Sequence, residues 1–216
     1  ILVQGSVSNK LDILVFIHEL AISEEEENKR FLRRKANMIF EALKLVLTQV
    51  FEKSEDEIPS KFLLYYINMI HKLCSIRSLV KSTSECYLRD FCEEVLVRLL
   101  AEDEEKEEAH EIRQLNRVEN DMLVKTLNST MLRVLENADP NDMFGILFDL
   151  LIKHRRVNNY SKILGLIIKC VLKLTKALEQ LVSVIKPEKI LLKSHFYLLE
   201  FGLDPSKFGE DIGIKT

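Results

Sequence analysis

The stretch from Arg133 to Leu151, RVLENADPNDMFGILFDLL, joins two leucine-rich segments through a short polar link that contains Asp139 and Pro140. An aspartate can accept hydrogen bonds from the free backbone amides at a helix start, and proline suits the first helical turn, where its missing N–H is not needed. The link therefore predicts that one helix ends near residue 137 and another begins at Pro140. Asp139 is interpreted as a cap that contributes about 1 kcal/mol, and not as a catalytic acid.

The composition of the whole chain favours an all-α fold. The 216 residues are 47% hydrophobic and 30% charged, but only 6 are glycine and 4 are proline. That is too few for a β protein with many turns. Leucine, lysine and glutamate dominate instead, and all three form helices well.

Apolar residues recur every three or four positions through most of the chain, which predicts amphipathic helices. Eight helices are expected, at about 10–22, 29–53, 59–76, 85–100, 113–137, 140–151, 159–179 and from 187 onward. The acidic segment AEDEEKEEAHEI at 101–112 has no apolar face. It is interpreted as a solvated loop, with an exposed helical segment as the alternative.

Pairing these helices in order gives units of roughly 40 to 50 residues, the period of HEAT and armadillo repeats. The predicted fold is an α-solenoid of stacked antiparallel helix pairs, similar to HEAT repeats, and a closed helical bundle is the alternative. We expect residues 1–201 to form a single domain of about four pairs, and 202–216 to be a tail truncated before a further helix. Because the first residue is Ile1 and not Met, we expect an excised fragment.

Motifs for catalysis, cofactors and metals are missing from the sequence. The five histidines are not in an HExxH spacing, the six glycines form no phosphate-binding loop, and there is no GxSxG motif. We therefore predict a protein that is not an enzyme and needs no cofactor. No secretory signal or membrane-spanning run is evident. The cysteines lack CxxC spacing and are expected to be reduced, buried thiols of a cytosolic protein: Cys74, Cys86, Cys92 and Cys170.

Positive charge is concentrated between residues 153 and 193, where ten basic residues face only Glu179 and Glu188 in a chain of net charge -3. Four lysines of the seventh expected helix follow one another at steps of seven, four and three, which places them along one edge. With the KHRR sequence at 153–156 they could form a basic ridge for an acidic partner, although a solvated helix face is the alternative. Nucleic acid is disfavoured because interleaved exposed aromatics are absent. The candidate residues are Arg155, Arg156, Lys162, Lys169, Lys173 and Lys176.

Three consecutive segments carry a family resemblance: MLRVLENADPNDMFGILFDLL, SKILGLIIKCVLKLTKAL and VIKPEKILLKSHFYLLEF. Their order and spacing resemble the C-terminal helical domain of the TOG-domain microtubule polymerases, the family of mini spindles and the tumour overexpressed gene proteins. The match is clear from about residue 118 to 201, and from 10 to 111 it rests on helix lengths and apolar spacing. The matching residues are largely core positions.

The resemblance implies a HEAT-like domain of a protein that acts at microtubule ends, centrosomes and spindle poles in the cytoplasm. TOG domains of this family bind tubulin through loops along one edge, typically led by a tryptophan. This chain has no tryptophan, and its corresponding first and third loops, SEEEENKR and ENADPND, are acidic. Its second loop, SIRSLVKSTS, carries Arg77 and Lys81, which join the candidate binding residues.

These departures favour the role that the resemblance implies for the family's last domain. That role is a monomeric adaptor module, which recruits the polymerase to spindle poles through a TACC-type coiled coil or the γ-tubulin complex. The alternative is direct binding of tubulin or the microtubule lattice through the basic edge. No membrane contact is expected.

Overall fold

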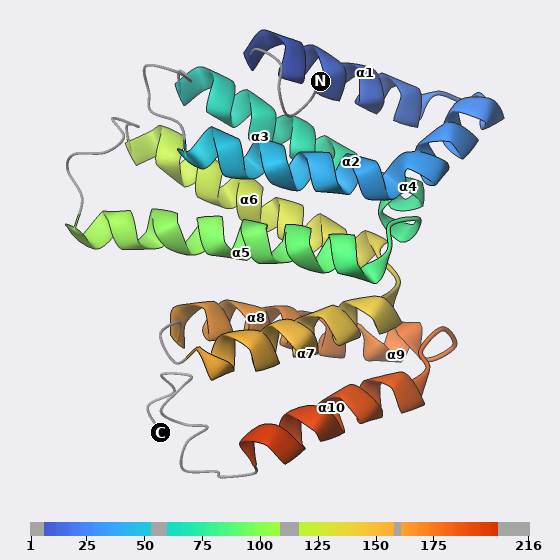
Figure 1. Cartoon of the computed structure of the whole chain (residues 1–216), viewed down its shortest axis with the longest axis vertical. Helices are drawn as coiled ribbons and strands as arrows, with labels where there is room; N and C mark the ends of the chain where they lie inside the picture. Colours follow the sequence, from blue (N-terminus) through green and yellow to red (C-terminus); the bar gives the residue numbers. More distant parts are fainter. Residues whose placement is uncertain (1–6, 53–59, 109–116, 158–160, 203–216) are drawn as a thin grey trace. The chain divides into compact units, whose positions relative to one another are not determined.

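The computed structural model describes residues 7–52, 60–108, 117–157 and 161–202, and in these ranges all the regular structure is helical (Figure 1). The all-α prediction is therefore confirmed. The helices are α1 (Val7–Ile22), α2 (Glu26–Glu52), α3 (Ser60–Cys74), α4 (Arg77–Lys81), α5 (Glu85–Glu108), α6 (Arg117–Asn137), α7 (Pro140–Arg156), α8 (Ser161–Lys176), α9 (Leu178–Leu181) and α10 (Pro187–Phe201).

The chain divides into two compact units, Ile1–Asn137 (unit 1) and Ala138–Thr216 (unit 2). The boundary falls at the polar link that separates α6 from α7. Each unit consists of helices packed side by side, as expected for HEAT-like stacking. The grouping of residues 1–201 into a single domain stays a prediction, as does a truncated tail at 202–216.

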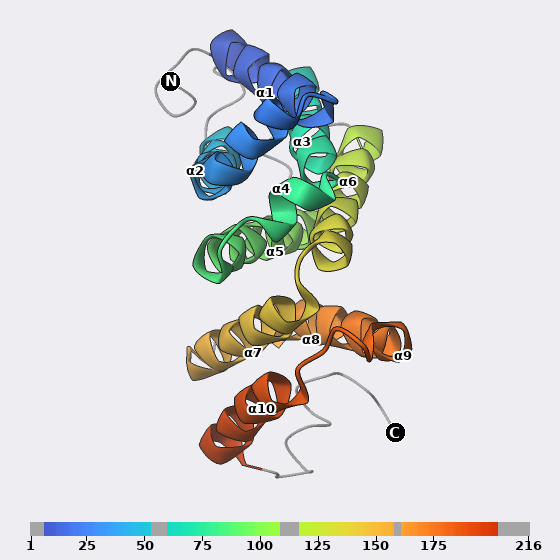
Figure 2. The same cartoon turned by 90° about the vertical axis from the view of Figure 1, so that its right-hand side faces the viewer.

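Unit 1 is built around two parallel seams, where α2 packs along α5 and α3 packs along α6 (Figure 2). The helices α5 and α6 also pack against each other, while α1 lies against α2 and α3. Several large side chains of these helices are fully buried, among them Tyr66, Phe40 and Phe91, and the rings of Phe40 and Phe91 meet edge to face with centroids 5.2 Å apart. Burial of such side chains is the main stabilising term for the unit.

Unit 2 is organised around α7, which packs against both α8 and α10. Apolar residues at three- and four-residue spacing place the seam of α7 and α8 in a core that contains Met143, Ile146, Leu147 and Leu150 of α7 with Ile163, Ile167 and Leu174 of α8. In contrast, Tyr197 is the one buried residue of α10. Gly202 ends α10 with a positive φ of 70°, a conformation that costs glycine little.

The polar link of the opening stretch folds as predicted. Asp139 has extended backbone angles, and its carboxylate accepts a hydrogen bond of 2.9 Å from the backbone amide of Asn141. Pro140 is the first residue of α7. The Asn141 side chain also donates to the Val184 carbonyl (3.2 Å) and accepts from the Lys186 amide (2.7 Å). The link thus starts α7 and also holds the chain that leads into α10.

Two predicted loops contain helix. The segment 101–108 continues α5 to Glu108, while 109–112 lies outside the described residues. Alanine, glutamate and lysine favour helix, and extending an existing helix is far easier than nucleating one, so no buried face is required. Similarly, Arg77–Lys81 forms the short helix α4, anchored by buried Leu79 and Val80.

The predicted pairing of neighbouring helices needs correction. The third expected helix (α3) packs along α6 instead of the fourth (α5), and α7 is the main partner of both α8 and α10. Apolar stripes show which face of a helix is buried, but not which helix covers it. The pairing therefore depends on connections and tertiary packing that periodicity does not encode.

Candidate protein-interaction surfaces

The four lysines of α8 form one exposed face. Lys162, Lys169, Lys173 and Lys176 are all exposed. At about 100° per residue they fall within an arc of about 60° around the helix axis. The helix contains no aspartate or glutamate. We call these four residues the lysine face; it carries four positive charges along a 16-residue helix.

The two arginines of the predicted ridge contact α10. Arg155 donates from Nη1 to the Tyr197 hydroxyl at 2.5 Å, and its guanidinium lies 4.9 Å from the centroid of the Phe201 ring. Arg156 pairs with Glu200 through Nη2 and Oε2 at 2.8 Å. This hydrogen-bonded pair holds the pKa of the Glu200 carboxyl below its usual value. Both arginines therefore already bind within unit 2.

Two further cations of the basic region form ion pairs between α7 and α10. Lys189 pairs with Asp142 at 2.7 Å, and Lys193 pairs with Asp149 at 2.6 Å. Acidic residues of α7 offset these two charges. The excess of positive charge predicted for residues 153–193 is therefore not spread evenly over the region. It is concentrated on the lysine face.

Arg77 and Lys81 are exposed on α4 in unit 1, whereas the other six candidate residues belong to unit 2. The eight candidate residues therefore do not form one surface on a single unit. The two acidic segments predicted as the first and third loops, SEEEENKR and ENADPND, are largely helical. Helix α2 begins at Glu26, and α7 begins at Pro140.

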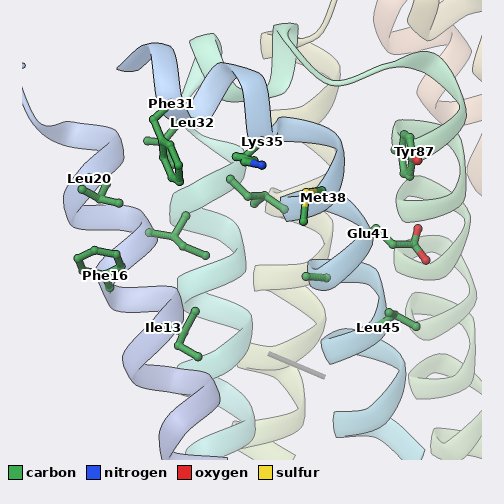
Figure 3. Close-up of a pocket in the computed structure, with 13 residues that line it drawn as sticks. Ile13, Phe16, Leu20, Phe31, Leu32, Lys35, Met38, Glu41, Leu45 and Tyr87 are labelled. Atoms are coloured by element: carbon green, nitrogen blue, oxygen red, sulfur yellow. The ribbon is translucent and has the colours of Figure 1, made fainter. Parts of the chain in front are cut away.

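An apolar groove that the sequence analysis did not predict lies in unit 1. Its volume is about 730 Å³, and its walls come from α1, α2 and α5 (Figure 3). The lining residues of α1 are Ile13, Phe16, Ile17 and Leu20; those of α2 are Phe31, Leu32, Lys35, Met38, Ile39, Glu41, Ala42 and Leu45; α5 contributes Tyr87. We call this set the apolar groove.

Phe31 is a large apolar residue of α2, yet its side chain is 51% exposed in the apolar groove. A signal for the groove was present in the sequence, because Phe31, Met38 and Leu45 recur at seven-residue intervals on α2. This row adds to the stripe that contains Phe40 and Leu43, both fully buried. A helix with two apolar sides can bury one of them in the core of its unit. The other side then needs a different contact to cover it.

The described residues provide no candidate metal site. No cluster of three or more His, Cys, Asp or Glu side chains suited to a metal ion occurs among them, and none of their helices is long and apolar enough to cross a membrane. All four cysteines are free thiols, but Cys86 is exposed, contrary to expectation. Burial raises the pKa of Cys170 to about 11, so this thiol is inert at neutral pH.

Comparison with known proteins gives two curated relatives. The chain is 27% identical over 205 residues to Protein MOR1 of rice and 26% identical over 206 residues to Protein MOR1 of Arabidopsis thaliana, and each match covers 88% of this chain. The chain spans about a tenth of the length of these relatives, 10% in each case. No protein-family model and no solved structure matches it.

The matches extend through both units, beyond the C-terminal segments in which the family resemblance is clearest. MOR1 is a member of the TOG-domain microtubule polymerase family. At this level of identity, the all-helical fold and the two relatives together support a relationship of this chain to the TOG-domain microtubule polymerases.

Proposed function

We propose that this chain is a non-catalytic interaction module of a cytoplasmic, microtubule-associated polymerase. It recruits the parent protein to spindle poles, centrosomes or microtubule ends by binding an adaptor, a TACC-type coiled coil or the γ-tubulin complex. The relationship to MOR1 supports the microtubule context. The adaptor role rests on the departures from tubulin-binding TOG domains, above all the absence of tryptophan.

The lysine face is the observation that carries this proposal. Its side chains are exposed and share one side of α8, and the helix has no acid of its own to offset them. A row of like charges on a rigid helix attracts and orients an acidic partner. Arg155 and Arg156 support the site indirectly, because their contacts with α10 stabilise unit 2.

The test is a charge reversal on the lysine face. The triple variant Lys169→Glu, Lys173→Glu, Lys176→Glu should lose binding to a purified TACC-type coiled-coil domain in a pull-down, while its circular dichroism stays that of the wild type. The matched variant with arginine at the same three positions keeps the charge and should still bind. Unchanged binding by the glutamate variant would remove the lysine face as the site.

The same face also favours a second candidate, direct binding of tubulin or the microtubule lattice through acidic tubulin tails. Co-sedimentation of the chain with microtubules at low and raised salt separates the candidates. A contact driven by exposed charges weakens steeply with salt because the Debye length falls from about 10 Å at 0.1 M to about 3 Å at 1 M. Salt-sensitive co-sedimentation that the glutamate variant loses would favour the lattice; no co-sedimentation at low salt would favour the adaptor.

A further inference from the structure

The apolar groove of unit 1 is long enough to bind a helix. Along α2 its lining runs from Phe31 to Leu45, which corresponds to about 21 Å at 1.5 Å per residue. Along α1 the lining from Ile13 to Leu20 covers about 10 Å. A helix of about 14 residues would match the longer wall.

Several large apolar side chains are left in contact with solvent along this groove. Phe16 is 57% exposed and Met38 is 66% exposed, although Leu14 and Ala36 on the same two helices are fully buried. Figure 3 shows Phe16 and Leu20 on α1 and Phe31 and Met38 on α2. Contiguous apolar side chains of this kind mark an interaction site more often than a scattered exposed leucine does.

The charges at the groove are complementary to an acidic partner. Glu41 is paired with Lys44 at 3.4 Å, and Lys44 also lies 3.8 Å from Asp90. Lys35, by contrast, makes no ion pair or hydrogen bond with any residue that the structure describes. The groove therefore offers one uncompensated ammonium group beside a long apolar surface.

We propose that the apolar groove binds an amphipathic helix of a partner protein, with an acidic residue next to the apolar stripe that contacts Lys35. Apolar side chains of the helix at positions i, i+3 or i+4, and i+7 would contact Phe16, Phe31 and Met38, as in other helix-in-groove complexes. The length of the groove favours a helix over a compact small molecule. This surface belongs to unit 1 and is distinct from the lysine face, so it goes beyond the proposed function.

The probe is a synthetic 18-residue helical peptide. It carries leucines at i, i+4, i+7, i+11 and i+14, glutamates beside that stripe, alanine and glutamine elsewhere, and one tryptophan. Because the chain contains no tryptophan, the indole emission during titration with the full chain comes from the peptide alone. A second peptide replaces the glutamates by lysine, and a third has the composition of the first in an order that breaks the stripe.

The glutamate peptide should bind, and the scrambled peptide should bind at least roughly tenfold more weakly. Met38→Glu should weaken binding of the glutamate peptide by roughly tenfold or more. Met122→Glu, a matched change at an exposed methionine of α6, should leave it unchanged. Lys35→Glu should reverse the preference between the glutamate and lysine peptides, while Lys125→Glu on α6 should not. Met38→Gln serves in place of Met38→Glu if the latter alters the circular dichroism spectrum.

Three results would overturn the proposal. They are equal binding of the ordered and scrambled peptides, no binding of any peptide, and no effect of substitution at Met38. Sedimentation velocity provides a further test, because a wild-type dimer that Met38→Glu converts to monomer would assign the groove to a second copy of the chain. The glutamate variant of the lysine face should bind the peptide like the wild type, which keeps this test separate from that of the proposed function.

Discussion

The helices of unit 1 and helix α10 of unit 2 are held in place by different kinds of contact. In unit 1, α2, α3, α5 and α6 bury rows of large apolar side chains, among them Phe40, Tyr66 and Phe91. Helix α10 buries only Tyr197 and is attached to α7 by two lysine–aspartate pairs, an arginine–glutamate pair and the contacts of Arg155.

The difference shows how one all-helical chain can combine parts of unequal stability. Burial of apolar area contributes roughly 25 cal/mol per Å² and depends little on salt. Exposed ion pairs contribute about 0–1 kcal/mol each and are screened. We therefore expect unit 1 to open only with global unfolding of that unit, and α10 to open locally at lower free energy.

The largest expected effect is in unit 1. Phe40→Ala removes a fully buried ring that packs against Phe91, so the free energy of unfolding should fall by about 3–5 kcal/mol. Chemical denaturation followed by circular dichroism measures the loss, and hydrogen exchange assigns it to α2 and α5. A loss below about 1 kcal/mol would mean that the core collapses around the cavity more completely than known cores do.

In unit 2, Leu147→Ala should lower the free energy of unfolding by about 2–5 kcal/mol, because this residue of α7 is fully buried. Hydrogen exchange should accelerate throughout α7, α8 and α10. If the amides of α10 exchanged as slowly as in the wild type, the attachment of α10 would not depend on a well-packed α7. That result would contradict the role given to the contacts between α7 and α10.

Two asparagines allow a matched test of polar attachment. Asn141 is buried and bonds Val184 and Lys186, while Asn37 bonds the amide and hydroxyl of Ser84 at an exposed site, at 2.8 and 2.9 Å. Asn141→Ala should cost about 1–3 kcal/mol because it removes a buried amide and leaves the part-buried Val184 carbonyl and Lys186 amide without this partner. Asn37→Ala should cost about 0.5–1.5 kcal/mol. Equal costs, compared by urea denaturation, would argue against a role for burial.

The ion pairs of α10 should give a smaller effect that depends on salt. Asp142→Asn removes the partner of Lys189 at a half-exposed site and should cost about 0.2–1 kcal/mol at low salt. Hydrogen exchange of α10 at 0.05 M and 1 M NaCl should show that the wild type and the variant converge at high salt. Parallel salt responses would show that this pair contributes nothing to holding α10.

The smallest expected effect is a pH dependence of unit 1. Burial, and secondarily the charge of Arg133, lowers the pKa of His71, and burial also lowers the pKa of His18. Because the folded state favours the neutral form, this contribution to stability is complete above the unfolded pKa of about 6.5. It is lost as the pH falls below that value. Denaturation of the wild type and His71→Gln between pH 7.5 and 5.5 should show a shallower decline for the variant.

The local features of the fold could be predicted from the sequence because local chemistry determines them. Asp139 and Pro140 start α7 through contacts within three residues. Pro187 is likewise the first residue of α10, where the cap residue Lys186 makes no side-chain cap hydrogen bond. The boundaries of α1 and α2 lie within a few residues of the predicted ones. The continuation of α5 to Glu108 was predicted only as the alternative to a loop, because the segment 101–112 has no apolar stripe and helix propensity alone did not decide between the two.

The binding surfaces were less predictable, because they depend on which helices meet. The alignment of the α8 lysines follows from helix geometry and could be predicted. The contact of Arg155 with Tyr197 joins residues 42 positions apart, so no spacing rule reveals it. The exposure of Phe31 likewise depends on how α1 lies against α2. Binding by any of the predicted residues stays a prediction.

The attachment of α10 also has a mechanical consequence. Under tension applied to the C-terminal end, α10 should detach before any other described helix of unit 2, because side-chain pairs at its surface yield one at a time. The seam of α7 and α8 would resist until its apolar side chains separate together. Stretching single molecules in optical tweezers should therefore show a small, salt-sensitive extension that precedes the main rupture.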